Sequence, residues 1–257
     1  MRPPEQDRPN STAAAARVES GRPRQLLARK VVLVKFQALP NVPDELNGII
    51  KSDSPPAQGV LSGTVKLDAD FTMDGFRAEL RKHYSIVHVA SHFDFEPGTY
   101  QHSFLLLGDG ARLTLDQFRN MPQVLQGVEL LTLSACDTAV GGDDGDGQEV
   151  EGLAVLAQRQ GAKAVIATLW AVADQSTALL MREFYLLHTS DPNITKAEAL
   201  RQAQLALLTG KLRGEASADR GVRPNRDGGA NVFVKDPERP FAHPYFWAPF
   251  LLMGNWK

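Results

Sequence analysis

VELLTLS at residues 128–134 and AVIATL at residues 164–169 are two short apolar runs, and EVEGLAVLAQRQ lies between them at residues 149–160. The middle segment carries its apolar residues at helical spacing and is followed by Gly161, whereas the two outer segments are typical of buried strands. A strand, a helix and a second strand in this order form a unit whose strands lie parallel. The stretch therefore predicts an α/β fold around a mostly parallel sheet.

The same alternation extends outward along the chain in both directions. Four further strands are predicted: KVVLVKF at 30–36, SIVHVA at 85–90, SFLLL at 103–107 and FLLM at 250–253. Helices are predicted at 70–82, from the capping box at 114–117, at 174–188, and from the capping box at 195–198 to residue 210. The strands alternate little between apolar and polar residues, as expected for a sheet with helices on both faces.

Composition excludes several classes of function. Of the 257 residues, 43% are hydrophobic, which is enough for a sizeable core. The formal net charge of -2 provides no strong positive field, so binding to nucleic acid or to an anionic membrane is not expected. No apolar run approaches the ~18 residues of a membrane span. The single cysteine, Cys136, excludes an internal disulfide and favours a reducing compartment, so a cytoplasmic location is expected.

Two segments differ in composition from the rest of the chain. Residues 1–29 are rich in Pro and Arg and poor in bulky apolar side chains, so they are interpreted as a disordered tail or linker. Residues 30–257 are interpreted as one domain with a long flexible insertion at 211–242. Two interpretations of this insertion are open: a surface loop without further role, or a segment that gates the substrate groove and is itself cleaved.

Chemically capable side chains follow three of the predicted strands. His92 follows the strand at 85–90, and Cys136 follows the strand at 128–134. Right-handed crossovers place the carboxyl ends of parallel strands at one edge of the sheet, where sites in such sheets lie. A thiol and an imidazole there are the parts of a cysteine nucleophile with its base. His92 precedes Cys136 by 44 residues, close to the roughly 50 residues of the caspase pair.

Four motifs make the match to a family specific: VHVASHF at 87–93, LLTLSACDTAVGG at 130–142, EVEGLAVLAQRQGAKAVIATLWAVADQST at 149–177 and HPYFWAPFLLMGNW at 243–256. In these motifs and in their order the chain resembles the CHAT domain family, caspase-like peptidase modules often found with TPR repeats. The resemblance implies a caspase-like three-layer fold, a mostly parallel sheet flanked by helices on both faces. It also implies that His92 is the catalytic histidine and Cys136 the nucleophile.

Four residues are predicted to contact the substrate. Many caspase-like enzymes have Gly after the histidine, with an N–H that helps to hold the oxyanion; here the residue is Phe93, whose N–H can do the same. By the same resemblance, Trp170 forms an apolar wall of the substrate pocket. Asp174 or Asp137 would favour Arg or Lys before the scissile bond. For Asp174 a second interpretation is open, as the N-cap of the helix that comes after it.

The remaining histidines and acidic residues do not indicate a metal site. On a strand, His88 and His92 would lie ~13 Å apart, too far to share one ion, so His88 is interpreted as a core residue or a support for the site. The acidic run 143–146 lacks the ligand spacing of a calcium loop. No metal or organic cofactor is expected. His188 is expected at the surface.

The sequence thus predicts a cysteine endopeptidase that hydrolyses peptide bonds through a Cys–His dyad. Its expected partners are a protein or peptide substrate and a TPR or other helical-repeat regulatory protein. The alternative is a catalytically inactive caspase-like scaffold that binds a partner protein through the same groove. Both members of the dyad favour the enzyme, whereas the departure at Phe93 favours the scaffold.

Overall fold

The computed structural model describes residues 39–51, 59–94, 100–134, 148–170, 174–213 and 236–257. All of them belong to the unit that spans Phe36–Lys257. The predicted tail at 1–29, the predicted strand at 30–36 and most of the predicted insertion at 211–242 lie outside the described residues.

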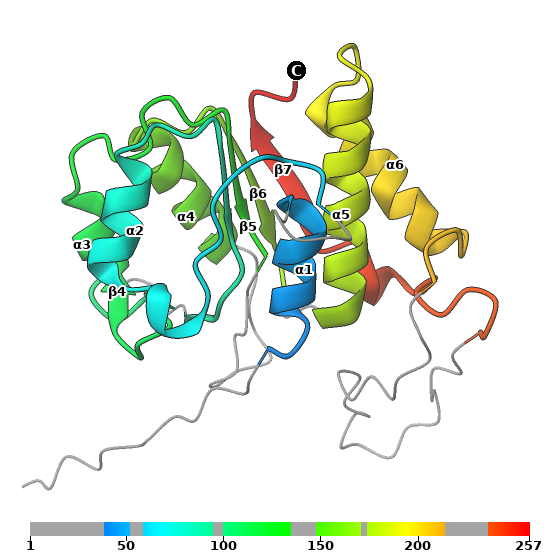
Figure 1. The fold of residues 1–257 in the computed structure, drawn as a ribbon, viewed down its shortest axis with the longest axis horizontal. Coiled ribbons are helices and arrows are strands. Elements are labelled where there is room, and N and C mark those ends of the chain that lie inside the picture. The colour runs from blue at the N-terminus through cyan, green and yellow to red at the C-terminus, as the bar shows by residue number, and fades with distance from the viewer. Residues whose placement is uncertain (1–38, 52–58, 95–99, 135–147, 171–173, 214–235) are drawn as a thin grey trace, which may run out of the picture. The chain divides into compact units, whose positions relative to one another are not determined.

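The central sheet has the strand order β1-β5-β6-β7. Its strands are β1 (Ile86–Val89), β5 (Leu130–Leu133), β6 (Ala164–Thr168) and β7 (Phe250–Gly254). The first three are parallel, and β7 is antiparallel to β6. The predicted strand–helix–strand unit is therefore confirmed, with β5 and β6 as neighbours and α4 (Gln148–Arg159) between them in the chain (Figure 1).

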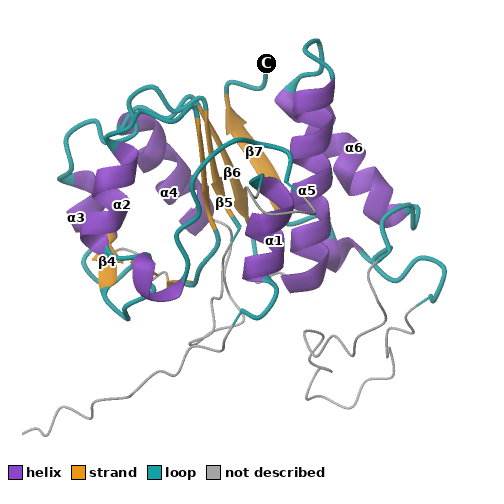
Figure 2. Cartoon of the chain, viewed as in Figure 1, coloured by secondary structure: helices purple, strands orange, loops and turns teal. Residues whose placement is uncertain are grey.

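Helices cover both faces of this sheet (Figure 2). On one side lie α2 (Met73–Leu80), α3 (Leu115–Arg119) and α4, and on the other lie α1 (Val42–Ile49), α5 (Asp174–Ser190) and α6 (Lys196–Leu208). Side chains of alternate strand residues enter two separate cores. Val89, Leu131 and Val165 belong to the core on the α4 side. Leu130, Ala164 and Ile166 belong to the core on the α5 side. The predicted three-layer α/β architecture is thus confirmed.

A second, antiparallel sheet comes directly after β1. Its strands, in the order β2-β3-β4, are β2 (Phe93–Asp94), β3 (Phe104–Leu106) and β4 (Arg112–Thr114). Only β3 is predicted from the sequence, because it lies within the apolar run SFLLL, whereas β2 and β4 are equally short and have no such run around them. This small sheet positions the chain immediately after the carboxyl end of β1.

The helix ends agree with the predicted capping chemistry in part. Thr114 Oγ1 accepts from the Gln117 N–H at 3.1 Å, and the Gln117 side-chain oxygen accepts from the Thr114 N–H at 3.0 Å, which is a complete capping box at α3. Thr195 caps α6 through the Glu198 N–H at 3.1 Å, but the predicted capping box at 195–198 is only half formed, because the Glu198 carboxylate accepts from Arg201 and Gln202 instead. A short helical turn, η1 (Asp68–Asp70), precedes α2, and another, η2 (Pro244–Phe246), precedes β7.

Candidate active site

Along the chain, His92 lies between the two sheets, three residues beyond the end of β1 and next to the first residue of β2. Its backbone C=O accepts from the Leu106 N–H at 2.9 Å, and the neighbouring Ser91 hydroxyl donates to the Leu106 C=O at 2.7 Å. The residue is only 6% exposed. The parallel sheet before it and the antiparallel sheet after it therefore fix the position of His92.

Phe93 begins β2 and pairs with Leu105 of β3. Its side chain is buried in the core on the α4 side. The hydrogen bond from the Leu106 N–H to the His92 C=O joins the residues next to the Phe93–Leu105 pair. In an antiparallel ladder the flanked residues direct their own N–H and C=O groups outward. The Phe93 N–H is accordingly directed away from β3.

The strand that leads to Cys136 runs beside β1 as far as both are described. Val89 pairs with Leu133, and the Ser134 N–H then donates to the Val89 C=O at 3.0 Å. Cys136 and Asp137 lie outside the described residues. The two strands that carry the predicted dyad at their carboxyl ends are thus direct neighbours, as predicted.

The third predicted strand end belongs to β6, which is the neighbour of β5. Trp170 comes after it, half-buried, and its indole N–H donates to the Tyr245 C=O at 3.1 Å. This bond holds the ring against the segment that precedes β7. Asp174 is the first residue of α5, so the helix begins one residue earlier than a cap at Asp174 implies. The Asp174 side chain lies outside the described part of the structure.

A buried polar network, largely absent from the sequence interpretation, lies on the α5 side of the sheet. His88 Nε2 is 2.9 Å from Glu45 Oε1 and 3.1 Å from Ser134 Oγ. His88 Nδ1 is 3.1 Å from the Tyr185 hydroxyl, which lies 2.7 Å from Thr132 Oγ1. The five residues come from α1, from β1, from β5 and the residue that follows it, and from α5. His88 is a core residue, as interpreted, and Glu45 is its acidic partner.

This network is not a Ser–His–acid relay. In such a relay the acid binds one ring nitrogen and the hydroxyl binds the other. Here Glu45 and Ser134 both meet Nε2 of His88. Burial raises the pKa of Tyr185 above its usual range, so its hydroxyl keeps its proton. That proton can turn between His88 and Thr132, so Tyr185 serves Nδ1 as donor or as acceptor.

The sequence offered one signal for this network. The helix α1 was not predicted, although Pro43 stands in its first turn with Asp44 and Glu45 directly after it, a pattern that suits a helix start. Only eight residues long, α1 shows too few turns for a clear apolar period. Ser134 and Tyr185 carry no sequence signal, because their role depends on contacts between distant elements.

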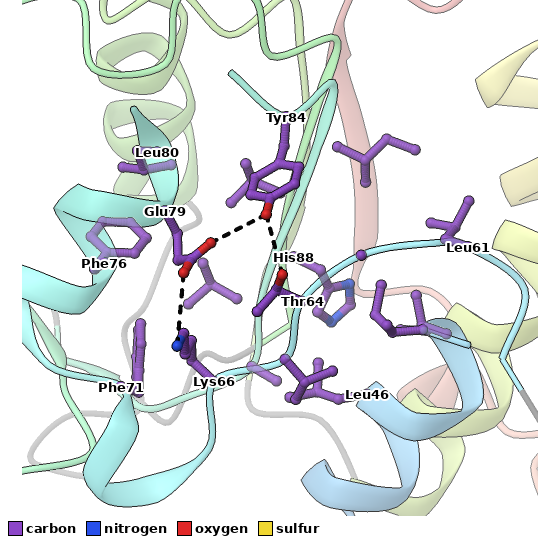
Figure 3. A pocket seen from close by; sticks show the side chains of 18 of the residues that line it. Leu46, Leu61, Thr64, Lys66, Phe71, Phe76, Glu79, Leu80, Tyr84 and His88 are labelled. Atoms are coloured by element: carbon purple, nitrogen blue, oxygen red, sulfur yellow. Dashed lines mark hydrogen bonds and ion pairs between the residues drawn. The ribbon is translucent and has the colours of Figure 1, made fainter. Parts of the chain in front are cut away.

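A cavity of about 230 Å³ lies beside β1, between α1, α2 and the segment that precedes α2 (Figure 3). Its walls are mainly apolar, and His88 is one of its lining residues. A chain of polar contacts crosses one side: Thr64 to Tyr84 at 3.2 Å, Tyr84 to Glu79 at 3.3 Å, and Glu79 to Lys66 at 3.8 Å. None of the predicted site residues that the structure describes lines this cavity.

The described residues offer neither a metal site nor a membrane-spanning helix. No group of three or more His, Cys, Asp or Glu side chains among them could hold a metal ion. None of the helices in the described ranges is long and apolar enough to cross a membrane.

The fold and the strand ends together define a class. A mostly parallel sheet with helices on both faces, whose neighbouring strands β1 and β5 lead to His92 and to the SACD segment, is that of a caspase-like α/β domain. Residues 3–255 match the family model of the CHAT domain. The chain therefore belongs to the CHAT domain family, which is related to caspase-like peptidases. No curated protein matches it.

Proposed function

We propose that the protein is a cysteine endopeptidase with His92 and Cys136 as its catalytic dyad. The observation that supports this most is the pairing of β1 with β5 up to the Ser134–Val89 hydrogen bond of 3.0 Å. In the sequence, the thiol of Cys136 comes two residues after Ser134, and the imidazole of His92 comes three residues after Val89. Paired parallel strands bring such residues to one edge of the sheet.

In the proposed reaction, His92 takes the thiol proton and the sulfur of Cys136 attacks the carbonyl carbon of the scissile bond. The N–H of Phe93, directed away from β3, and the N–H of Cys136 stabilise the oxyanion. His92 then gives the proton to the leaving amine, which departs as the C–N bond breaks. Water, deprotonated by His92, cleaves the thioester, and the acid product leaves with the thiol restored.

The proposed specificity is for a basic residue before the scissile bond. Trp170 would line this pocket, and its hydrogen bond to Tyr245 supports a fixed wall there. Asp174 or Asp137 would pair with the guanidinium or ammonium group. A peptide mixture incubated with the protein and analysed by mass spectrometry should show cleavage after Arg or Lys. Cleavage after Asp or Leu would contradict this specificity.

The dyad itself is tested by substitution. Cys136→Ala and His92→Ala should each reduce peptide turnover by at least about 10³-fold, and the double variant should be hardly worse, because the two residues act as a unit. Circular dichroism should show each variant folded. His83→Asn, which removes an exposed histidine, is the matched control and should retain activity. Turnover that persists in Cys136→Ala would exclude this mechanism.

The second candidate is an inactive scaffold that binds a partner protein. The deep burial of His92 and the packing of Phe93 into the core favour it, because both limit access to the proposed base. Iodoacetamide labelling distinguishes the two, since Cys136 is the single thiol of the chain. An activated thiol reacts rapidly at neutral pH, whereas a scaffold thiol shows the profile of a free cysteine with a pKa of about 8.5.

A further inference from the structure

Four elements of the fold meet at one imidazole ring. His88 on β1 contacts Glu45 of α1, Ser134 at the end of β5 and Tyr185 of α5. His88 is also directly opposite Thr132 in the β1–β5 register. Through these contacts the ring joins the two strands of the proposed dyad to one another and to the helices that cover them.

The Glu45 carboxyl group is costly to place here. Glu45 is only 1% exposed, and removing a carboxylate from water costs several kcal/mol unless hydrogen bonds compensate. Apolar side chains of similar volume would pack between α1 and the sheet without this cost. We therefore expect the Glu45–His88 pair to contribute to the geometry of the strands and not to the free energy of unfolding. The pair holds the His88 ring where it contacts Ser134.

The position of Ser134 relative to β1 matters because the thiol of Cys136 lies close to Ser134 in the sequence. Ser134 is the last described residue before the segment that carries Cys136, two residues further on. His92 is four residues beyond His88 on the neighbouring strand. A displacement of about 1 Å between reacting groups can cost roughly 100-fold in rate. A contact that fixes the end of β5 relative to β1 would therefore control the approach of thiol and imidazole.

We propose that His88, held by Glu45, is a positioning residue that fixes the carboxyl end of β5 through Ser134, and with it the thiol of Cys136 relative to His92. The positioning of the strand end is a property of the described network, and its catalytic consequence rests on the proposed peptidase function. The substitution that tests it is Ser134→Ala, which removes the contact with β5 and leaves the Glu45–His88 and Tyr185–Thr132 contacts in place.

The control is Thr168→Val. Thr168 is the last residue of β6 and is fully buried, and its hydroxyl has no hydrogen-bond partner among the described residues. This variant removes a hydroxyl from a comparable strand end without breaking a described contact. Ser134→Ala should lower kcat for a cleaved peptide at least about tenfold with little change in KM, whereas Thr168→Val should leave both unchanged.

A second pair of variants tests the role of Glu45. Glu45→Gln keeps an acceptor oxygen for the His88 N–H and should stay within about threefold of the wild-type kcat. Glu45→Ala removes the acceptor and should fall to the level of Ser134→Ala. If Glu45→Ala and Glu45→Gln have the same kcat while only their melting temperatures differ, the pair has a structural role and the inference is wrong.

Hydrogen exchange provides a readout that does not depend on peptidase activity. The N–H of residue 134, bonded to Val89 in the wild type, should exchange, relative to its intrinsic rate, at least about tenfold faster in Ser134→Ala than in Thr168→Val. Faster exchange in a protein that cleaves no peptide would support positioning of the strand end and refute the peptidase proposal. Unchanged exchange and unchanged kcat in a protein that does cleave peptides would refute the positioning role alone.

Discussion

At the scale of single residues, His188 differs from its sequence interpretation as a surface residue. It is half-buried on α5, stacks on Phe184 with ring centroids 5.9 Å apart, and its Nδ1 has no partner among the described residues. Burial, assisted by the positive charge of Lys196, lowers the pKa of His188 below 6.5. Phe184 lies four residues earlier on α5, so helical spacing could indicate the ring contact, but the burial of His188 and the nearness of Lys196 on α6 depend on how these helices pack.

The lowered pKa of His188 predicts a loss of stability in mild acid. As pH falls below about 6.5 the unfolded chain binds a proton at this position before the folded chain does, so the free energy of unfolding decreases until the folded pKa is passed. His188→Gln removes this contribution. Urea unfolding at pH 7.5 and at pH 5.5 should show a smaller decrease for His188→Gln than for the wild type; equal decreases would contradict the prediction.

At the scale of elements, the sequence predicts best those strands and helices whose own residues form a continuous apolar run or a clear apolar period. The strands β1, β5, β6 and β7 coincide with predicted segments to within two residues at each end, because buried strands require continuous apolar runs. The helix predicted at 70–82 is shorter in the structure, since Thr72 caps it and accepts from the Gly75 N–H. The helix α1 and the strands β2 and β4 are stabilised by packing and pairing. Their own sequences therefore carry too weak a pattern to predict them.

Gly161, which closes α4, shows how one residue joins two elements. Its φ is +111°, and an added Cβ would lie 2.8 Å from both N and Cα of Gln126. Gly161→Ala should therefore lower the free energy of unfolding by about 3 kcal/mol, from backbone strain and a clash with backbone atoms.

Gly127 is the matched control for this prediction. Its φ is +88°, but nothing lies within 4 Å of an added Cβ. Gly127→Ala should cost only the strain of a positive φ, about 1–2 kcal/mol. Urea unfolding of both variants isolates the clash as the difference between them, and equal losses would show that the approach of α4 to residues 125–126 is not tight.

At the scale of the whole molecule, the part of the site that could be predicted is its placement. Parallel strands with right-handed crossovers require that residues after β1, β5 and β6 gather at one edge, and the order β1-β5-β6 satisfies this. The partners of His88 could not be predicted, because Glu45, Ser134 and Tyr185 come from three segments that only the tertiary fold brings together. Contacts between distant segments leave no period in the sequence.

The residues on either side of the undescribed part of the insertion at 211–242 predict that this part can be shortened. Arg213 forms an ion pair with Glu238 at 2.8 Å, and Asp236 forms another with Arg239 at 3.0 Å. The chain therefore leaves α6 and returns at nearly the same place, so residues 214–235 can be replaced by a short Gly–Ser linker. Shortening a loop changes its closure entropy by only about 1 kcal/mol, so cooperative unfolding should persist with a similar melting temperature.

The same deletion separates the two interpretations of the insertion. If residues 214–235 gate the substrate groove, kcat/KM for a short peptide should rise when they are removed, because the substrate no longer competes with them. If they form a surface loop without further role, kcat/KM should stay within about twofold of the wild type, as for surface changes remote from a site. We expect the second result, since the ion pair between Arg213 and Glu238 joins the two flanks to one another just beyond α6 rather than to a residue of the proposed site. A rise in kcat/KM of about tenfold or more, with the melting temperature unchanged, would contradict this expectation and establish gating, because so large a gain exceeds the effect of a remote surface change.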